Sequence, residues 1–125
     1  RSKPVRLFSN ATMPPTFVEG FHDPNEIAKM EFRPLGKRCV DMQGNPMEVS
    51  ILSLGASSFG GVYQGETNED ECLQVTHEAL KAGVNLIDAA AWYGHGRAEE
   101  TLAKALKGIP REAYYLNTKV CRYEP

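Results

Sequence analysis

Apolar residues change their spacing in a repeating way from residue 51 onward. Three short apolar runs predict strands, at Ile51–Leu54, Val84–Ile87 and Tyr114–Val120. Between these runs apolar residues recur at helical spacing, which predicts two amphipathic helices. The apolar positions are Cys72, Val75, Ala79 and Ala82 for the first helix and Ala98, Leu102, Ala105 and Ile109 for the second. The strands begin about 30 residues apart, which is the length of a βα unit.

Local signals mark where both helices begin and end. Asn68 is a suitable amino-terminal cap, and Glu71, three residues later, is its reciprocal partner. Gly83 predicts a left-handed residue that ends the first helix. Gly108 and Pro110 stop the second helix.

Strands separated by single helices are expected to be parallel, with right-handed crossovers. Upstream of them, 31–33 and 47–49 predict a short hairpin. The segment 1–30 contains four prolines and no helical or strand period, so we expect an amino-terminal arm on the surface or partly disordered. Two βα units and a third strand expose an unpaired apolar edge. We therefore expect this chain to be the first part of a larger domain, or to associate with itself or with a partner chain.

Composition excludes several classes of function. The 125 residues are 42% hydrophobic and 24% charged with a net charge of -2, so nothing indicates a nucleic-acid or anionic-membrane partner. No apolar run approaches the roughly 20 residues of a membrane span. The three cysteines are odd in number, lack C-x-x-C spacing and lack metal-ligand spacing with the histidines. This pattern predicts no metal site and fits a reducing compartment, the cytoplasm. Residues 1–18 are basic and faintly like a mitochondrial transit peptide, although a leader ahead of Met13 is the favoured interpretation.

Three side chains that can take part in proton transfer are predicted to lie at one edge of the sheet. Asp88 directly follows the run Val84–Ile87, Tyr93 lies in the next loop, and Lys119 lies near the end of the third strand. In parallel α/β proteins ligands bind at the carboxyl ends of the strands. Each residue alone is more often structural, Asp88 as a loop cap and Tyr93 as a surface ring. Together they predict a site, because a lysine beside a phenol favours the phenolate and makes the phenol a usable acid near neutral pH.

Four stretches carry a resemblance to a known family. The nine residues 86–94, Leu-Ile-Asp-Ala-Ala-Ala-Trp-Tyr-Gly, resemble the active-site signature of the aldo-keto reductases, and Thr118-Lys119-Val120 resembles that family's lysine motif. Residues 32–36 resemble its opening hairpin and residues 54–61 its first cofactor loop. The chain is most similar to the L-galactose-dehydrogenase-like branch, and the segment 16–23 is similar to insect members of that branch.

The resemblance implies an α/β fold, the amino-terminal portion of a (β/α)8 TIM barrel over residues 31–125, preceded by the β-hairpin. It implies an oxidoreductase that uses NADP or NAD to interconvert an aldehyde, ketone or sugar and its alcohol or lactone. Tyr93 would be the general acid, Lys119 would lower its pKa, and Asp88 would pair with Lys119 near the nicotinamide ribose. The implied lining residues are Gly55, Ala56, Ser57 and Asp88 for the cofactor, and Phe59 and Trp92 for the substrate.

The sequence leaves two alternatives open. The family's catalytic histidine belongs to a fourth strand, beyond Pro125, and His95 is a weak substitute because an exposed loop histidine is the simpler interpretation. The chain is also consistent with a truncated, non-catalytic product or a binding subunit, since the family is similar to potassium-channel beta subunits.

The stretch 36–50 is longer than the family's usual hairpin turn.

Overall fold

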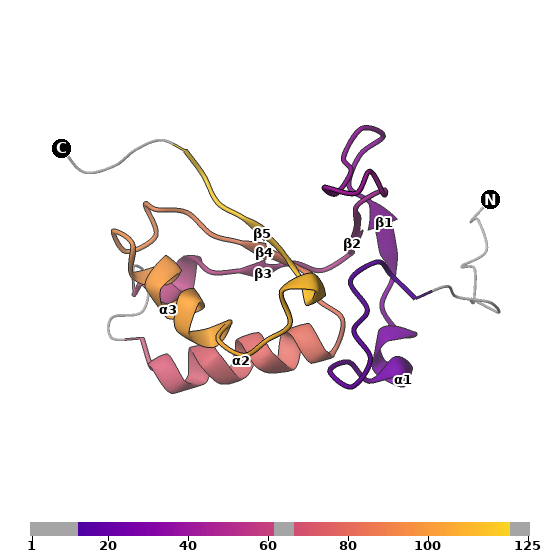
Figure 1. Cartoon of the computed structure of the whole chain (residues 1–125). Coiled ribbons are helices and arrows are strands. Elements are labelled where there is room, and N and C mark those ends of the chain that lie inside the picture. Colours follow the sequence, from indigo (N-terminus) through magenta and orange to yellow (C-terminus); the bar gives the residue numbers. More distant parts are fainter. Residues whose placement is uncertain (1–12, 62–66, 121–125) are drawn as a thin grey trace, which may run out of the picture.

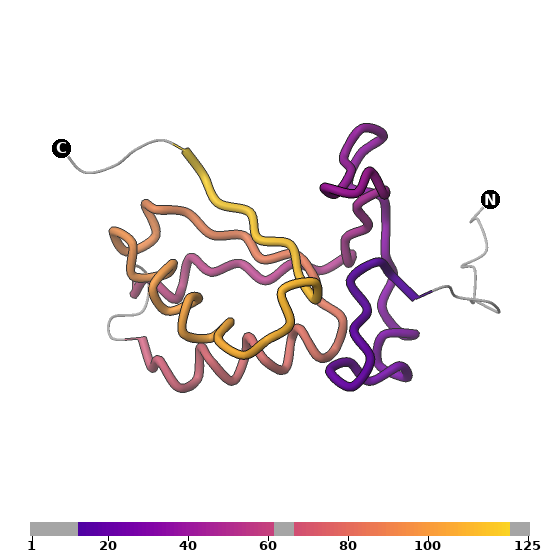
Figure 2. The backbone as a smooth tube through the Cα atoms, in the orientation of Figure 1, coloured from indigo at the N-terminus to yellow at the C-terminus, as the bar shows by residue number. Residues whose placement is uncertain are grey.

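A parallel three-stranded sheet forms the centre of the computed structural model, which describes residues 13–61 and 67–120 (Figure 1). The strands β3 (Leu54–Gly55), β4 (Leu86–Asp88) and β5 (Tyr115–Asn117) are hydrogen-bonded in that order. Two helices, α2 (Glu69–Lys81) and α3 (Arg97–Ala105), lie together on one face of the sheet (Figures 1 and 2). The opposite face carries no helix of the described residues. The described architecture is therefore an open α/β unit with a parallel sheet, as the order of elements predicted.

The core lies between the sheet and this pair of helices. Ile87 of β4 and Leu80 of α2 are fully buried, and Leu102 of α3 is 2% exposed. The short 3-10 helix η1 (Ser57–Gly60) closes one end of the core, and η2 (Arg111–Ala113) precedes β5. Because the strand register aligns Gly55 with Asp88 and Asp88 with Asn117, the carboxyl ends of all three strands meet at one rim.

The predicted hairpin is present beside the sheet. Strand β1 (Phe32–Pro34) pairs antiparallel with β2 (Glu48–Ser50), one residue later in each strand than the sequence suggested. The predicted strand Ile51–Leu54 is mostly wrong, because Ile51 and Leu52 are 50% and 61% exposed in a bend. The Ser50 hydroxyl donates to the Leu52 carbonyl at 2.6 Å, which turns the chain from the hairpin into the sheet.

The helix signals are confirmed, but the buried face of α2 differs from the predicted one and also includes Leu80. The Asn68 side chain accepts from the Asp70 and Glu71 amides and caps α2. Val75, expected on the buried face, is 48% exposed, whereas Thr76 is fully buried. The Thr76 hydroxyl donates to the Cys72 carbonyl at 2.7 Å, so its polarity is satisfied and the residue can enter the core.

The predicted second and third strands are shorter than expected. The ladder of β4 begins at Leu86, two residues later than predicted, and includes Asp88. The ladder of β5 ends at Asn117, so Thr118 and Lys119 extend beyond the sheet. Helix α3 buries Ala98, Leu102 and Ala105 as predicted, and Ile109 is buried just after its end.

The described part of the predicted arm, 13–30, packs more tightly than the sequence suggested. It contains the one-turn helix α1 (Pro24–Ile27), capped by Asp23, and Ile27 is 3% exposed. His22 is 7% exposed, and its Nδ1 accepts from the Val18 amide at 2.9 Å. Burial lowers the pKa of His22, which keeps the ring neutral. Residues 1–12 lie outside the described part.

A buried polar cluster joins this segment to the sheet and the hairpin. Asn85, 1% exposed just before β4, accepts from the Ser50 amide through Oδ1 at 2.7 Å. Its Nδ2 donates to Thr16 Oγ1 and to the Glu48 carbonyl, both at 2.9 Å. The Ser50 hydroxyl accepts from the Asn85 amide at 3.0 Å. Since every buried side-chain polar atom of the described residues has a partner, burial of this cluster is compensated.

Candidate active site

The rim residues are positioned by backbone hydrogen bonds across the strand ends. The Ala56 amide donates to the Asp88 carbonyl at 2.9 Å, and the Ala89 amide donates to the Asn117 carbonyl at 2.8 Å. These bonds continue the ladders one step beyond β3 and β4. They hold Asp88, the last residue of β4, between its two neighbours.

Tyr93 is held over this rim by a close contact between two loops. Gly94 has a φ of 64°, in the left-handed region that favours glycine. A Cβ added at Gly94 would lie 2.2 Å from the Gly60 carbonyl oxygen, and one added at Gly60 would lie 2.6 Å from the Tyr93 carbonyl. The loop after β3 and the loop after β4 therefore touch backbone to backbone, which only glycines allow.

Asp88, Tyr93 and Lys119 meet as predicted. The Lys119 ammonium donates to both carboxylate oxygens of Asp88 at 2.9 Å, to Tyr93 Oη at 3.1 Å and to the Ala89 carbonyl at 2.9 Å. The Tyr93 hydroxyl lies 3.4 Å from Asp88 Oδ2. The ammonium also lies 4.7 Å from the centre of the Tyr93 ring. The Lys119 ammonium thus links the carboxylate at the end of β4 to the phenol of the loop that follows it.

The charges of this cluster reinforce one another. The Lys119 ammonium holds the pKa of the Asp88 carboxyl below its usual range, and a hydrogen bond from Asn117 acts in the same direction. The Asp88 carboxylate in turn raises the pKa of Lys119. Both residues are therefore charged over a wide range around neutrality. Their side chains are 37% and 43% exposed, so the cluster is open to a ligand.

Two neighbours of the cluster were not predicted from the sequence. The Asn117 side-chain amide donates to Asp88 Oδ1 at 2.7 Å, and the Thr118 hydroxyl donates to Glu99 Oε1 on α3 at 2.7 Å. The first contact follows from the strand register, which places Asn117 directly opposite Asp88.

Comparison with known proteins identifies the family. Residues 51–125 match the model of the aldo/keto reductase family. The chain belongs to this family. It is 34% identical over 100 residues to L-galactose dehydrogenase of Arabidopsis thaliana, covering 78% of this chain and 29% of that protein. It is 36% identical over 73 residues to the NADH-specific methylglyoxal reductase of Escherichia coli (strain K12), covering 57% of this chain and 22% of the relative.

A solved aldo-keto reductase also shares the fold. The holo form of an enzyme from Bacillus halodurans superimposes with a TM-score of 0.57 and 33% identity, over 73% of this chain and 26% of that one. The fold is therefore the amino-terminal part of an aldo-keto reductase (β/α)8 barrel. The chain spans between 22% and 29% of the lengths of these three proteins.

The residues that the family resemblance assigns to the cofactor border Asp88. Gly55 is exposed and aligned with Asp88, whereas Ala56 is fully buried and Ser57 partly buried. A Cβ added at Gly55 would meet nothing within 4 Å, so open space lies beside the carboxylate. The assignment of these residues to a cofactor stays a prediction.

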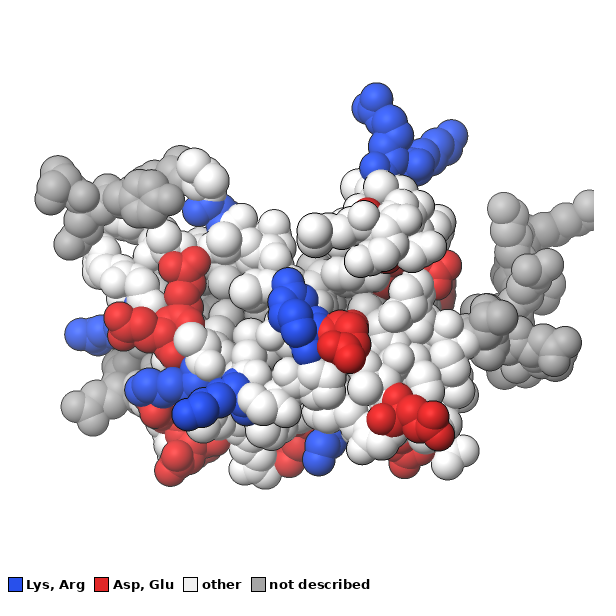
Figure 3. All heavy atoms as spheres, in the orientation of Figure 1, with Lys and Arg blue, Asp and Glu red and all other residues white. Residues whose placement is uncertain are grey.

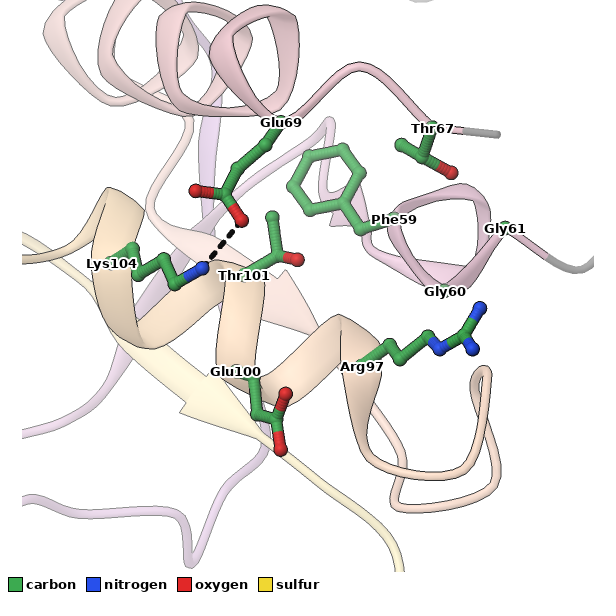
Figure 4. Close-up of a pocket in the computed structure, with 9 residues that line it drawn as sticks. All are labelled: Phe59, Gly60, Gly61, Thr67, Glu69, Arg97, Glu100, Thr101 and Lys104. Carbon is green, nitrogen blue, oxygen red and sulfur yellow. Dashed lines mark hydrogen bonds and ion pairs between the residues drawn. The ribbon is translucent and has the colours of Figure 1, made fainter. Parts of the chain in front are cut away.

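The two residues assigned to the substrate lie in different surroundings. Trp92 is 37% exposed in the loop before Tyr93, with its ring edge to face with that of His95 at 5.0 Å. Phe59 is 8% exposed and belongs to the core beneath the helices. It borders a hollow of about 620 Å³, in which the Glu69–Lys104 ion pair joins α2 to α3 (Figure 4). The residues lining this hollow do not include the three of the cluster, and a substrate role for Phe59 stays a prediction.

None of the helices in 13–61 and 67–120 has the length and apolar character needed to cross a membrane. Within the same ranges, no three His, Cys, Asp or Glu side chains are grouped so as to hold a metal ion. Acidic and basic side chains are interspersed on the face seen in Figure 3.

Proposed function

We propose that the protein is an NAD(P)-dependent oxidoreductase that interconverts a carbonyl compound and its alcohol. The observation that carries this proposal is the position of the Lys119 ammonium, 2.9 Å from both Asp88 oxygens and 3.1 Å from the Tyr93 hydroxyl. A cation held by a carboxylate and directed at a phenol favours proton donation by that phenol.

The nicotinamide cofactor would supply or accept a hydride at the substrate carbon when bound. The residues of this chain handle the proton. In the reductive direction Tyr93 Oη gives its proton to the carbonyl oxygen, which becomes the alcohol. The Lys119 charge stabilises the phenolate left behind, and Asp88 keeps Lys119 in place. In the oxidative direction the same phenolate takes the proton back.

The structure supports a cofactor beside Asp88. The exposed Gly55 and its unobstructed space adjoin the carboxylate at the rim. Gly55, Ser57 and Asp88 would hold the nicotinamide end and Trp92 would lie toward the substrate, whereas Ala56 and Phe59 are buried behind them. The choice between NAD and NADP is open, and one relative is named as NADH-specific.

The substrate class that we propose is a small aldehyde, ketone or sugar, converted to its alcohol or lactone. Two of the relatives are named for L-galactose and for methylglyoxal, one a sugar and the other a small carbonyl compound. The proposed location is the cytoplasm, because Cys39 and Cys72 are both free thiols.

Replacement of one hydroxyl tests the proposal. In the natural protein, Tyr93→Phe is expected to lower kcat at least about 100-fold while cofactor affinity stays within a few-fold, because only the proton donor is lost. The matched control is Tyr114→Phe, since Tyr114 is buried under the helices and lies outside the cluster. Retention of more than about a tenth of kcat in Tyr93→Phe would remove Tyr93 from the acid role.

A second candidate function is a binding role without catalysis. The observation that favours it is the edge of the sheet, because β5 pairs only with β4 among the described strands. Leu116 and Val120 near this edge are 46% and 88% exposed. We propose that another strand pairs here, from the same protein, a second copy or a partner chain. Sedimentation of the purified chain reports this association, whereas turnover by the natural protein would exclude a purely binding role.

A further inference from the structure

The Asp88 carboxylate accepts more hydrogen bonds than its pairing with lysine requires. Lys119 contacts both oxygens, so either oxygen would serve equally for charge pairing. The two oxygens are made different by a second donor on each. Asn117 Nδ2 lies 2.7 Å from Oδ1, and Tyr93 Oη lies 3.4 Å from Oδ2.

Asn117 is itself tightly anchored. Its backbone carbonyl accepts from the Ala89 amide at 2.8 Å, and its position in β5 is directly opposite Asp88 in β4. The next residue, Thr118, is bonded to Glu99 of α3. The segment leading to Lys119 is therefore fixed to both β4 and α3.

The short Asn117 contact has a geometric consequence. Rotation about the terminal bond of an aspartate is broad and costs little, so a carboxylate alone is poorly oriented. A hydrogen bond to Oδ1 from a side chain whose backbone is fixed in β5 restricts this rotation. It leaves Oδ2 facing the phenol and both oxygens within reach of the ammonium.

We propose that Asn117 is a positioning residue that orients the Asp88 carboxylate, and through it the ammonium of Lys119, toward the Tyr93 hydroxyl. The proposal rests on the proposed function for its catalytic consequence, but the orientation of the carboxylate is a property of this chain alone. A neutral amide is suited to this role, because it adds a hydrogen bond without adding a charge that would compete with Lys119.

The groups that determine the titration of Asp88 are few. The charged and titratable side chains bonded to Asp88 are Lys119 of the segment after β5 and Tyr93 of the loop after β4. Glu99 of α3 is bonded to Thr118. Strand β3 presents only Gly55 opposite Asp88. Loss of the Asn117 donor should therefore be visible as a change in the acid titration of Asp88 itself.

The test is a carbon-13 NMR titration of aspartate carboxyls in the natural protein, with the Asp88 signal assigned by Asp88→Asn. Asn117→Leu, close to isosteric but without a donor, is expected to raise the pH at which Asp88 titrates. Asn117→Ser, whose shorter side chain cannot reach Oδ1, should act in the same direction and guards against misfolding of the first variant.

A matched control exists in the hairpin. Asn45 Nδ2 donates to Asp41 Oδ2 at 3.1 Å, so Asn45→Leu removes a similar amide from a different aspartate. It should change the titration of Asp41 and leave that of Asp88 unchanged. An Asp88 titration unaltered in both folded Asn117 variants would overturn the proposal.

Kinetics provide the second readout. Asn117→Leu is expected to lower kcat about tenfold, with the substrate KM within about twofold and an altered pH–rate profile, because orientation and not binding is lost. An unchanged kcat and pH profile would overturn the catalytic consequence. If the natural protein turned over no carbonyl substrate, the proposed function would fail, while the NMR titration would still decide the role of Asn117.

Discussion

Two polar networks lie at opposite ends of the same short strand. At the amino end of β4, Asn85 joins Thr16, Glu48 and Ser50 in a cluster in which Asn85 is 1% exposed. At the carboxyl end, three residues later, Asp88 is partly exposed, with 37% of its side chain accessible in an ion pair. Both networks link segments far apart in the sequence, but only one of them is open to a ligand.

The difference shows how one strand separates stability from chemistry. The Asn85 network is uncharged, and its donors and acceptors are used within the protein, so its removal leaves buried groups unpaired. The Asp88 network holds a cation and a phenol at the surface, where an exposed ion pair contributes little to folding. We expect substitutions at the amino end to act on stability, and those at the carboxyl end to act on activity.

The largest expected effect on stability is that of Asn85→Leu. The buried Ser50 amide and Thr16 hydroxyl lose their partners, so the free energy of unfolding should fall by about 2–4 kcal/mol. Urea unfolding of the natural protein measures this, with Asn117→Leu as the comparison at the other end of the sheet. Equal losses in the two variants would contradict the division between the two networks.

A smaller effect is expected where the two rim loops touch. In Gly60→Ala the added methyl would lie 2.6 Å from the Tyr93 carbonyl and 2.7 Å from the Gly94 nitrogen, both backbone atoms. Relief of this clash should cost about 1–3 kcal/mol and move Tyr93, so kcat falls as well. Gly55→Ala is the control for stability, because its methyl meets nothing within 4 Å. A Gly60→Ala variant of normal stability and kcat would show that the loop contact does not position Tyr93.

The residues at the carboxyl end of β4 could be predicted from the sequence better than those at its amino end. Asp88, Tyr93 and Lys119 carry recognisable chemistry, and strand ends in parallel sheets coincide, so their meeting followed from the order of elements. Asn117 was missed because a neutral amide gives no such signal. Its meaning depends on the register that aligns it with Asp88 across the sheet.

The buried cluster could not be predicted because its contacts are long-range. Asn85 binds Ser50, 35 residues earlier, and Thr16, 69 residues earlier, and no local pattern relates the three. The same limit explains why 13–30 was predicted as an arm, since its buried residues are few and separated by turns. Thr76 was missed for a local reason, because a hydroxyl bonded within its own helix can be buried like an apolar group.

The smallest expected effect on stability is the pH dependence of the Asp88–Lys119 pair. The pKa of Asp88 is lowered in the folded protein, mainly by the hydrogen bond from Lys119, so its contribution is present above the unfolded value of about 3.9. That contribution is lost as the pH falls through the lower, folded value. The pKa of Lys119 is raised, mainly by the bond to Asp88, so its contribution is complete below about 10.4 and is lost as the pH rises through the folded value.

The stability difference between wild type and Asp88→Asn should therefore be constant from about pH 5 to 9 and shrink outside that window. Because the side chains are 37% and 43% exposed, we expect it to stay below about 1 kcal/mol even at its plateau, and to fall further as salt is added. Urea unfolding at a series of pH values measures it. A plateau as large as the loss in Asn85→Leu would mean that the rim network also maintains the fold, and the contrast between the two ends of β4 would disappear.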